Sequence, residues 1–294
     1  MSDMGTVGLI GLGIMGGAIA PNLIAAGFPV VGFDTDPARC EALAAAGVEI
    51  AASVAVLAGK TTRILSSLPN HKALDHTVAA LLASGVAGLT LIELSTLPIA
   101  AKQSARDALA GPGHVMLDCP LSGTGAQART KDLTVYASGD TAAIAATAAV
   151  FAGFAKASFD LGAFGNGSRM KYVANLLVFI HNVAAAEALV LGEKAGLDPQ
   201  QIVDVVKLGA GGSRMLEVRG PLMARGQYTP VTAGFPMYYK DLGVISQFAM
   251  DLDCPTPLLS ASLPYYLAGG AAYPEEDVAA VHKVLARMAG LTPD

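Results

Sequence analysis

The stretch Val7-Gly8-Leu9-Ile10-Gly11-Leu12-Gly13-Ile14-Met15-Gly16 decides the fold of this chain. An apolar run passes directly into glycines with the spacing Gly-x-Gly-x-x-Gly, and an alanine-rich segment of helical length follows. Gly11 permits a tight turn, Gly13 lets the backbone approach a pyrophosphate, and Gly16 allows a helix to pack closely on a strand. The pattern therefore predicts a strand, a dinucleotide-binding loop and a helix whose free N–H groups face the phosphates. The residues expected to line the cofactor are Gly11, Leu12, Gly13, Ile14, Met15 and Gly16.

Asp34 ends the second apolar run, Pro29–Asp34, close to the roughly 20-residue distance at which such loops are followed by an acidic residue. A carboxylate there accepts hydrogen bonds from the ribose hydroxyls of NAD and repels the 2′-phosphate of NADP. Two alternatives stay open. Asp34 is a turn residue beside Asp36 and Pro37, or Arg39 pairs with a phosphate. The sequence favours NAD as the cofactor and leaves NADP as the less favoured alternative.

Short β-branched runs alternate with alanine-rich stretches in the first half of the chain, which is typical of βαβ units around a mostly parallel sheet. The expected strands are Thr6–Gly11, Pro29–Asp34, Arg63–Leu68, Leu89–Leu94, His114–Cys119, Leu133–Ser138 and Lys156–Asp160, with early helices at Gly16–Ala26, Pro37–Ala45 and Ala73–Ala83. After about Gly162 only helices are expected, at roughly Ser168–Ala195, Asp198–Lys207, Lys240–Met250 and Asp277–Ala289. We therefore predict a Rossmann-type doubly wound α/β domain over residues 1–162 and an all-α domain over residues 163–294, joined by the long helix from about residue 168.

The composition excludes several functional classes. Hydrophobic residues make up 53% of the 294 residues and charged residues 15%, which excludes a disordered chain. A net charge of −5 offers no basic stripe to bind nucleic acid. The most apolar segment, Tyr172–Leu191, is interrupted by polar residues such as Asn175 and Asn182, which favours a buried core helix over a membrane span.

The cysteines and histidines indicate the compartment and the absence of a resident metal. Cys40, Cys119 and Cys254 are odd in number and far apart, without metal or redox spacing. The five histidines form no zinc pattern, so no metal is expected. The N-terminus has no basic region of the kind that opens a signal peptide. We predict a cytoplasmic protein.

Lys171 lies on an otherwise apolar helix that the pattern predicts to be buried. Lys171, Asn175 and Asn182 fall on one face of this helix, which indicates either a cavity or an internal hydrogen-bond network. Burying an amine is costly, and partial desolvation lowers its pKa toward neutrality, where it can transfer protons. The alternative is a solvated surface lysine. We interpret Lys171 as a candidate acid/base group.

Four separated blocks resemble the β-hydroxyacid dehydrogenase family, in the group of 3-hydroxyisobutyrate dehydrogenase and tartronate semialdehyde reductase. The blocks are Gly8 to Gly16, Asp118-Cys119-Pro120-Leu121-Ser122-Gly123-Thr124-Gly125, Gly165-Asn166-Gly167-Ser168-Arg169-Met170-Lys171 with Asn175, and Lys240-Asp241-Leu242. The resemblance covers nearly the whole chain. It implies an NAD-dependent oxidoreductase that transfers a hydride between a small 3-hydroxy acid and the nicotinamide.

The resemblance also implies a role for single residues. Lys171 would be the catalytic acid/base, with Asn175 binding the small carboxylic-acid substrate beside it. Ser122, Gly123 and Thr124 would hold the substrate carboxylate through N–H and O–H donors. The family positions that line the dinucleotide correspond to Leu68, Pro69, Thr96 and Lys240. Family members form homodimers or homotetramers, which implies the same here.

Some residues depart from the family pattern, and rival functions stay open. The second block more often has alanine, valine and glycine where this chain has Cys119, Leu121 and Thr124, beside the expected carboxylate site. One rival is an NAD(P)H-dependent reductase of a small aldehyde acid, such as tartronate or succinic semialdehyde, or of an imine. The other is a non-catalytic NAD-sensing protein.

Overall fold

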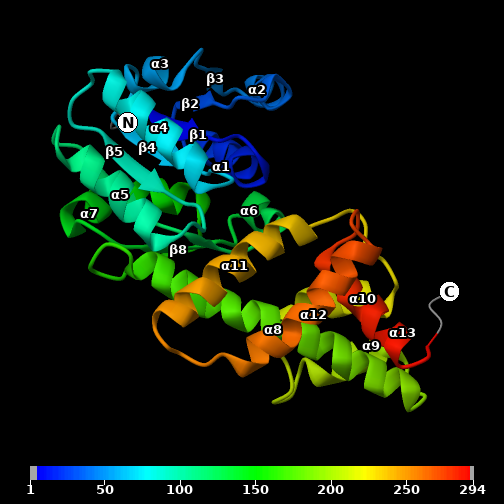
Figure 1. Cartoon of the computed structure of the whole chain (residues 1–294). Helices are drawn as coiled ribbons and strands as arrows, with labels where there is room; N and C mark the ends of the chain where they lie inside the picture. The colour runs from blue at the N-terminus through cyan, green and yellow to red at the C-terminus, as the bar shows by residue number, and fades with distance from the viewer. Residues whose placement is uncertain (1–4, 292–294) are drawn as a thin grey trace. The chain divides into compact units, whose positions relative to one another are not determined.

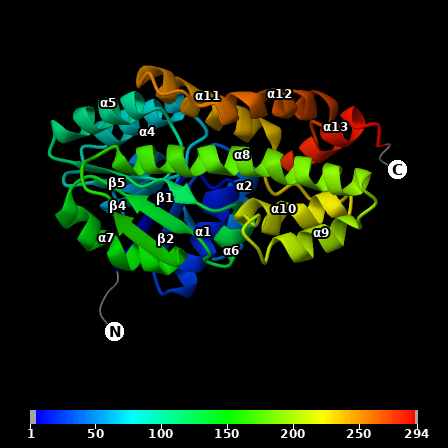
Figure 2. The ribbon, with the colours of Figure 1, turned by 90° about the horizontal axis from the view of Figure 1, so that it is seen from below.

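The computed structural model describes residues 5–291, and the contacts within it divide the chain into two units. The first unit ends at Lys171 and the second begins at Tyr172. This division falls inside the long helix α8 (Asn166–Lys194), which runs unbroken through it (Figure 2). The boundary at residue 162 predicted from the sequence lies in the loop that precedes α8.

A six-stranded parallel sheet forms the centre of the first unit, in the order β3-β2-β1-β4-β5-β6 (Figure 1). Its strands are β1 (Val7–Ile10), β2 (Val30–Phe33), β3 (Glu49–Ile50), β4 (Arg63–Ser66), β5 (Thr90–Glu93) and β6 (Val115–Asp118). This is the doubly wound order, in which the chain reverses direction across the sheet between β1 and β4. Ligands of such sheets bind beyond the carboxyl ends of the strands at that reversal.

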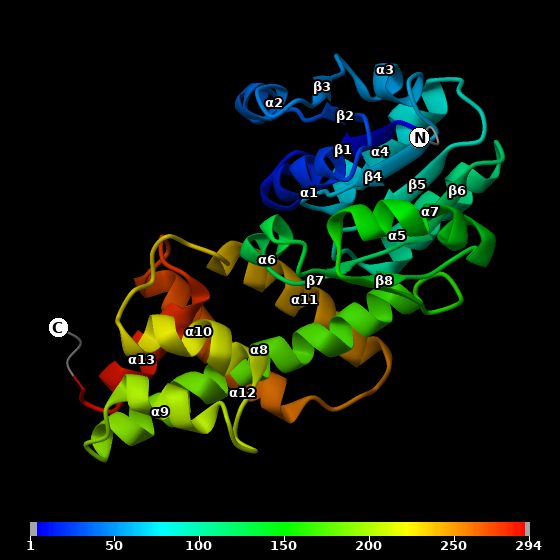
Figure 3. The ribbon, with the colours of Figure 1, turned by 180° about the vertical axis from the view of Figure 1, so that it is seen from behind.

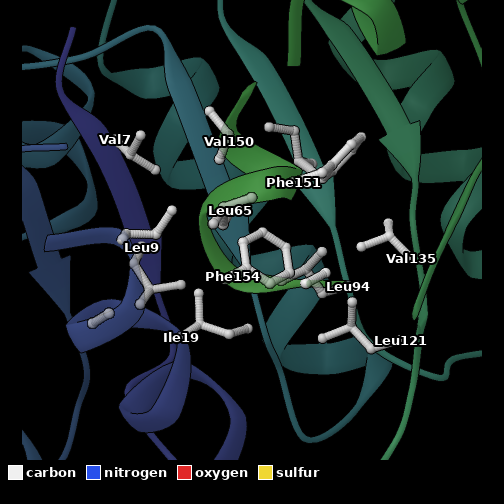
Figure 4. Packing of buried hydrophobic residues seen from close by; sticks show 14 of the residues in the cluster. Val7, Leu9, Ile19, Leu65, Leu94, Leu121, Val135, Val150, Phe151 and Phe154 are labelled. Carbon is white, nitrogen blue, oxygen red and sulfur yellow. The ribbon is translucent and has the colours of Figure 1, made fainter. Parts of the chain in front are cut away.

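Helices cover both faces of this sheet. Successive side chains of each strand point to opposite faces, and apolar side chains on both faces need to be buried. The helices of the first unit before α8 are α1 (Ile14–Ala25), α2 (Pro37–Ala44), α3 (Val54–Ala58), α4 (His71–Ala83), α5 (Ile99–Ala110), α6 (Gly125–Arg129) and α7 (Thr141–Phe154). On one face Leu65 packs with Ile19 of α1 and Phe154 of α7 (Figure 4). On the other face its neighbour Ile64 belongs to the core that α3, α4 and α5 close.

A second, smaller sheet has the order β7-β8-β9 and links the main sheet to the start of α8. Its strands are β7 (Leu121–Ser122), β8 (Thr134–Ala137) and β9 (Ala157–Asp160). Strand β8 pairs antiparallel with β7 and parallel with β9. Just beyond it, Ser138 exchanges two backbone hydrogen bonds of 2.9 Å with Asp118 at the end of β6.

Among the described residues of the second unit, Tyr172 to Leu291, the regular elements are helices, and an isolated antiparallel bridge joins Gly234 to Asp277. Its elements after α8 are α9 (Pro199–Val206), α10 (Arg214–Ala224), α11 (Phe235–Asp251), α12 (Pro257–Ala272), the short 3-10 helix η1 (Val278–Ala280) and α13 (Val281–Met288). Figure 3 shows these helices arranged along α8. Aromatic contacts stabilise this packing. The ring centroid of Phe179 on α8 lies 4.7 Å from that of Tyr238 and 5.8 Å from that of Tyr266.

The predicted fold class is confirmed, and the differences concern single elements. All seven expected strands form, and the two-residue strands β3 and β7 are additional. Helix α11 begins at Phe235 rather than at Lys240, because Pro236 occupies a position in the first helical turn that proline favours. Helices α10 and α12 were not expected, and each contains an internal proline, Pro221 in α10 and Pro264 in α12.

Helix α8 is long and apolar enough to cross a membrane, judged by length and composition alone. The core helix of a globular protein passes the same test. Two polar residues of α8 have partners within the second unit, since Asn175 bonds Asp241 and Asn182 bonds Tyr266. These bonds support the prediction of a core helix.

Candidate active site

The glycine loop lies between β1 and α1, at the point where the order of the sheet reverses. Gly11 has a φ of +90°, and a side chain there would collide with the carbonyl oxygen of Ser67. A side chain at Gly16 would collide with the carbonyl oxygen of Gly11. Both glycines are therefore required by the backbone, as the sequence predicts.

The start of α1 fits the pyrophosphate of a dinucleotide. Its N-cap is Gly13, no side chain caps it, and its first turn contains no acidic residue. The backbone N–H groups at a helix start carry partial positive charge and need an acceptor. An anion is the acceptor that such a start binds best.

Asp34 follows β2 and contacts the glycine loop directly. One carboxylate oxygen accepts the Leu12 N–H at 2.7 Å and the other accepts the Asp36 N–H at 2.9 Å. Burial alone would raise the pKa of Asp34, but these two hydrogen bonds and the Arg39 guanidinium at 3.4 Å outweigh it and hold the pKa below its usual value. Asp34 therefore presents a full negative charge beside the loop.

Leu68, Pro69 and Thr96 follow the carboxyl ends of β4 and β5, on the same edge of the sheet as the glycine loop. The Leu68 N–H donates to the hydroxyl of Ser95 at 2.7 Å, which ties the two loops together. Leu68 and Thr96 are half-buried and Pro69 is exposed. Their role in lining a dinucleotide stays a prediction.

The loop Ser122–Thr124 leaves β7 and enters α6. Gly123 has a φ of +129°, and a side chain on it would press on Leu133 at 2.6 Å. Thr124 caps α6 together with Gln127, whose side-chain oxygen accepts the Thr124 N–H at 3.0 Å and contacts the Thr124 hydroxyl at 3.3 Å. Both donors of Thr124 are thus engaged inside the protein. The carboxylate-binding role that the resemblance implies for Ser122, Gly123 and Thr124 stays a prediction.

Helix α6 also meets the cofactor loop. Ile14, the first residue of α1, is 71% exposed, and its side chain lies directly over Gly125, where a Cβ would collide with it. Asn22 of α1 donates to the carbonyl oxygen of Ala128 at 2.7 Å. The first unit therefore holds the loop Gly11–Gly16 and the loop Ser122–Thr124 next to each other.

Lys171 is 9% exposed and lies in the second turn of α8, still within the first unit. Three residues earlier, the backbone N–H of Ser168 donates to the carboxylate of Asp118 at 2.8 Å and its hydroxyl donates to the same group at 2.7 Å. Asp118 itself is fully buried. The amine is thus carried on a helix whose start is fastened to the end of β6.

Asn175 lies one turn after Lys171 on α8 and belongs to the second unit. Its amide nitrogen donates to the carboxylate of Asp241 on α11 at 3.0 Å. This bond fixes the orientation of the Asn175 amide. Asp241 also lies 3.1 Å from the amine of Lys240, which is 32% exposed. The sequence pointed to Asp241 only as the neighbour of Lys240.

Asn182, the third polar residue of the α8 face, has a different role. It is fully buried, and its amide nitrogen donates to the hydroxyl of Tyr266 and to the carbonyl oxygen of Val278, both at 3.2 Å. The Tyr266 hydroxyl in turn donates to the carbonyl oxygen of Phe179 at 2.9 Å. The predicted polar face is therefore an internal network at Asn182.

Two family profiles together match residues 6–285 of the chain. Residues 6–164 match the NAD-binding domain of 6-phosphogluconate dehydrogenase, and residues 165–285 match a domain described as the NAD-binding domain of NADP-dependent 3-hydroxyisobutyrate dehydrogenase. A curated relative, the L-threonate dehydrogenase of Cupriavidus necator, is 35% identical over 285 residues and 95% of each chain. The chain belongs to the β-hydroxyacid dehydrogenase family. It is an NAD-dependent hydroxyacid dehydrogenase.

Solved structures and further relatives agree with this assignment. The 3-hydroxyisobutyrate dehydrogenase of Mycobacterium tuberculosis with L-serine has a TM-score of 0.87 and 26% identity, and covers 96% of this chain and 99% of that one. The glyoxylate/succinic semialdehyde reductase 1 of Arabidopsis thaliana is 30% identical over 80% of this chain and 81% of its own. The family thus includes relatives named for different small acids, and β-hydroxyacid dehydrogenases share this fold over the full length of the chain.

No group of three or more His, Cys, Asp or Glu side chains that could hold a metal ion occurs within residues 5–291. The three cysteines are free. Burial, reinforced by the Asp118 carboxylate, raises the pKa of the Cys119 thiol well above its usual value, so Cys119 stays a neutral thiol.

Proposed function

We propose that this dehydrogenase oxidises the CH–OH group of a small 3-hydroxy acid similar to 3-hydroxyisobutyrate, with Lys171 as the acid/base group. The observation that carries the proposal is the burial of Lys171, a residue only 9% exposed, near a helix start that Asp118 holds in place. Asn175 follows one turn later, with its amide oriented by Asp241. A largely buried lysine one helical turn away from an amide side chain is suited to binding a hydroxyl group and taking its proton.

The substrate is bound at its acidic end by the loop after β7. The Gly123 N–H and the Ser122 hydroxyl donate to the carboxylate, and Thr124 keeps the loop in shape through Gln127. The substrate hydroxyl then donates toward Lys171 and Asn175. As the carbon–hydrogen bond breaks, the neutral amine of Lys171 takes the hydroxyl proton, and the product is the corresponding carbonyl acid. In the reverse direction the ammonium of Lys171 returns that proton.

NAD, when bound, supplies the acceptor for the hydride. The chain's own contribution is the loop Gly11–Gly16 and the uncapped start of α1 for the pyrophosphate. Asp34 accepts the ribose hydroxyls, and Leu68, Pro69 and Thr96 line the remaining length. For Lys240, which belongs to the second unit, the lining role rests on the family resemblance alone. NADP is the less favoured cofactor because the charge of Asp34 opposes a 2′-phosphate.

L-threonate is the second candidate substrate, because curated relatives with 35% and 34% identity are named L-threonate dehydrogenases. Reduction of an aldehyde acid is the third, since the semialdehyde reductase relative shares 30% identity. We place imine reduction and a non-catalytic NAD sensor after these, because neither uses a buried lysine as its acid/base.

The test is the variant Lys171→Ala, assayed with 3-hydroxyisobutyrate, L-threonate and succinic semialdehyde, each with NAD(H) and NADP(H). General acid/base catalysis contributes about 10²–10⁴-fold, so we expect kcat to fall within that range while the dissociation constant for NADH stays within twofold. Lys194→Ala, at the exposed end of the same helix, is the matched control and should keep normal turnover. Normal turnover of Lys171→Ala would refute the proposal. NADH binding without turnover of any substrate would favour the sensor.

We also propose that the enzyme is cytoplasmic and assembles as a homodimer or homotetramer. Helix α8 carries a stripe of exposed apolar side chains along its length, including Val173, Leu177 and Leu191. Large exposed apolar patches mark interaction surfaces, and a second copy of the chain is the partner we propose. Light scattering on wild type and on Leu177→Glu tests this, with a monomeric variant expected and an unchanged mass counting against it.

A further inference from the structure

Three charged side chains form a fully buried cluster in the first unit. Lys102 of α5 is 1% exposed, and Glu93 and Asp118, at the ends of β5 and β6, are 0% exposed. The two carboxylates are neighbours because Glu93 and Asp118 are register partners in the parallel sheet. The proposed reaction uses none of these three groups directly.

Lys102 is bound on all sides. Its amine lies 2.6 Å from Glu93 Oε2 and donates to Asp118 Oδ1 and to the carbonyl oxygen of Ser95, each at 2.7 Å. Burial alone would lower the pKa of Lys102, but the charges of Asp118 and Glu93 outweigh it and raise the pKa above its usual value. The cluster therefore holds one positive charge that persists at neutral pH.

Besides its ion pair with Lys102, the Asp118 carboxylate accepts hydrogen bonds from the start of α8. It accepts the Ser168 N–H at 2.8 Å and the Ser168 hydroxyl at 2.7 Å. Ser138 adds a second fastening, since its hydroxyl accepts the Gly167 N–H at 2.9 Å and lies 3.3 Å from Asp118. Two consecutive backbone N–H groups of the first turn are thus satisfied by residues 29 and 50 positions earlier in the chain.

Charge explains why a carboxylate stands there. Two carboxylates and one ammonium leave an excess of negative charge in the cluster when all three are ionised. The start of α8 carries the complementary partial positive charge of a helix N-terminus. Hydrogen bonds to a charged acceptor are roughly twice as strong as neutral ones, so this fastening is rigid. Gly167 sharpens the fit, because a Cβ on it would collide with the Tyr136 carbonyl oxygen and lie 2.6 Å from that of Asp118.

We propose that Asp118, held by Lys102 and Glu93, is a positioning residue that fixes where Lys171 lies, by fastening the start of α8 through Ser168. The inference rests on the proposed role of Lys171 and adds the residues that set its geometry. Lys171 follows Ser168 by three residues, so a rotation or shift of the first turn moves the amine with it. Small displacements of a reacting group are costly, since about 1 Å of misplacement can lower a rate by about a hundredfold.

The test is a double-mutant cycle in the full-length enzyme with NAD and the best substrate of the panel. Ser168→Ala removes one of the two bonds to Asp118 and should fold, while Asp118→Asn removes the charge and is the stronger variant. We expect Ser168→Ala to lower kcat about tenfold with the NADH dissociation constant unchanged, and Asp118→Asn to lower it further. In the Lys171→Ala background, Ser168→Ala should cause no additional loss, because a positioning residue acts only through the group it positions.

The outcomes separate this inference from the proposed function. A tenfold loss that multiplies the loss of Lys171→Ala would overturn the positioning role and leave the role of Lys171 intact, as would normal turnover of Ser168→Ala. Normal turnover of Lys171→Ala would overturn both. The control is Ser213→Ala, which removes a hydroxyl that caps α10 by accepting the Leu216 N–H at 3.1 Å. That variant should unfold at a lower temperature and keep the wild-type kcat.

Discussion

Each unit of this dehydrogenase buries a cation beside a carboxylate, and the two clusters bind different segments of the chain. In the first unit, Lys102 faces two carboxylates, and Asp118 reaches out of the cluster to the start of α8. In the second unit, Arg219 is 1% exposed and donates to Asp277 at 3.3 Å. The other carboxylate oxygen of Asp277 accepts the backbone N–H of Thr232 at 2.9 Å and the Thr232 hydroxyl at 2.6 Å.

The difference teaches that buried charge by itself does not mark an active site. The Arg219 cluster pairs one cation with one carboxylate, and its remaining bonds close loops of the helical unit on each other. The Lys102 cluster contains two carboxylates for one cation. One of these carboxylates, that of Asp118, accepts hydrogen bonds from the start of the helix that carries Lys171. A buried carboxylate makes hydrogen bonds in addition to its ion pair. The groups that donate those bonds distinguish a positioning role from a stabilising one.

The largest expected effect comes from Lys102→Met, which leaves two carboxylates buried without their cation. Removing one partner of a buried pair costs about 3–5 kcal/mol, so the free energy of unfolding should fall by that amount. Turnover per folded molecule should also fall at least tenfold, because Asp118 loses its orientation. Urea unfolding and active-site titration measure the two quantities separately. Unchanged turnover per folded molecule would contradict the positioning role of the Lys102 cluster.

Asp277→Ala should match that loss of stability without the loss of turnover. It leaves the Arg219 guanidinium buried and unpaired, so the free energy of unfolding should fall by about 3–5 kcal/mol. The folded fraction should keep the wild-type kcat and pH profile. Asp204→Ala, at an exposed pair on α9, is the control and should leave the unfolding curve in place. A kcat that falls together with stability would show that this cluster also serves the chemistry.

Asp34 tests the contrast from a third position. Like Asp277 it accepts backbone N–H groups of a loop, but it does so beside the predicted cofactor site. A hydrogen bond to a charged group contributes about 1.5–3 kcal/mol, so Asp34→Ala should raise the KM for NAD by at least about tenfold. The KM for NADP should rise less, because a repulsive charge is removed. Asp36→Ala is the control, and an unchanged NAD/NADP ratio in Asp34→Ala would remove Asp34 from the cofactor site.

The smallest expected effect is a difference in pH response. Burial raises the pKa of Asp277, but Arg219 and the hydrogen bonds from Thr232, Ala279 and Ala233 outweigh it, so the net pKa lies below the ordinary 3.8. Its contribution to stability is therefore complete above about pH 4 and is lost as the pH falls through the lowered value. Lys102 has the opposite sign, with a contribution complete below its ordinary pKa of 10.5 and lost only at higher pH. The difference in melting temperature between wild type and Asp277→Ala should shrink below pH 4, and a constant difference would contradict this assignment.

The sequence was sufficient for the features that depend on local pattern. The glycine loop is readable because a tight turn and a close approach each require glycine at a fixed spacing, and Gly11 and Gly16 meet those requirements. The strands of the first unit are readable because both faces of a parallel sheet are buried. Lys171 stands out because an amine on an apolar helix has no ordinary reason to be there.

The sequence was insufficient where a role depends on distant partners. Lys102 resembles any solvated lysine of an amphipathic helix, and only the fold brings it to Glu93 and Asp118. Asp241 orients Asn175 across 66 residues of chain, which no periodicity can indicate.

Gly167 has a practical consequence for redesign of this enzyme. The first turn of α8 touches the backbone of two strands at that position, with no space for even a methyl group. A saturation library at residue 167 should therefore return glycine alone among active clones. The same limit applies at Gly123, so variation aimed at new acids is better placed at Ser122, which is half-buried and lies in the loop proposed to bind the carboxylate.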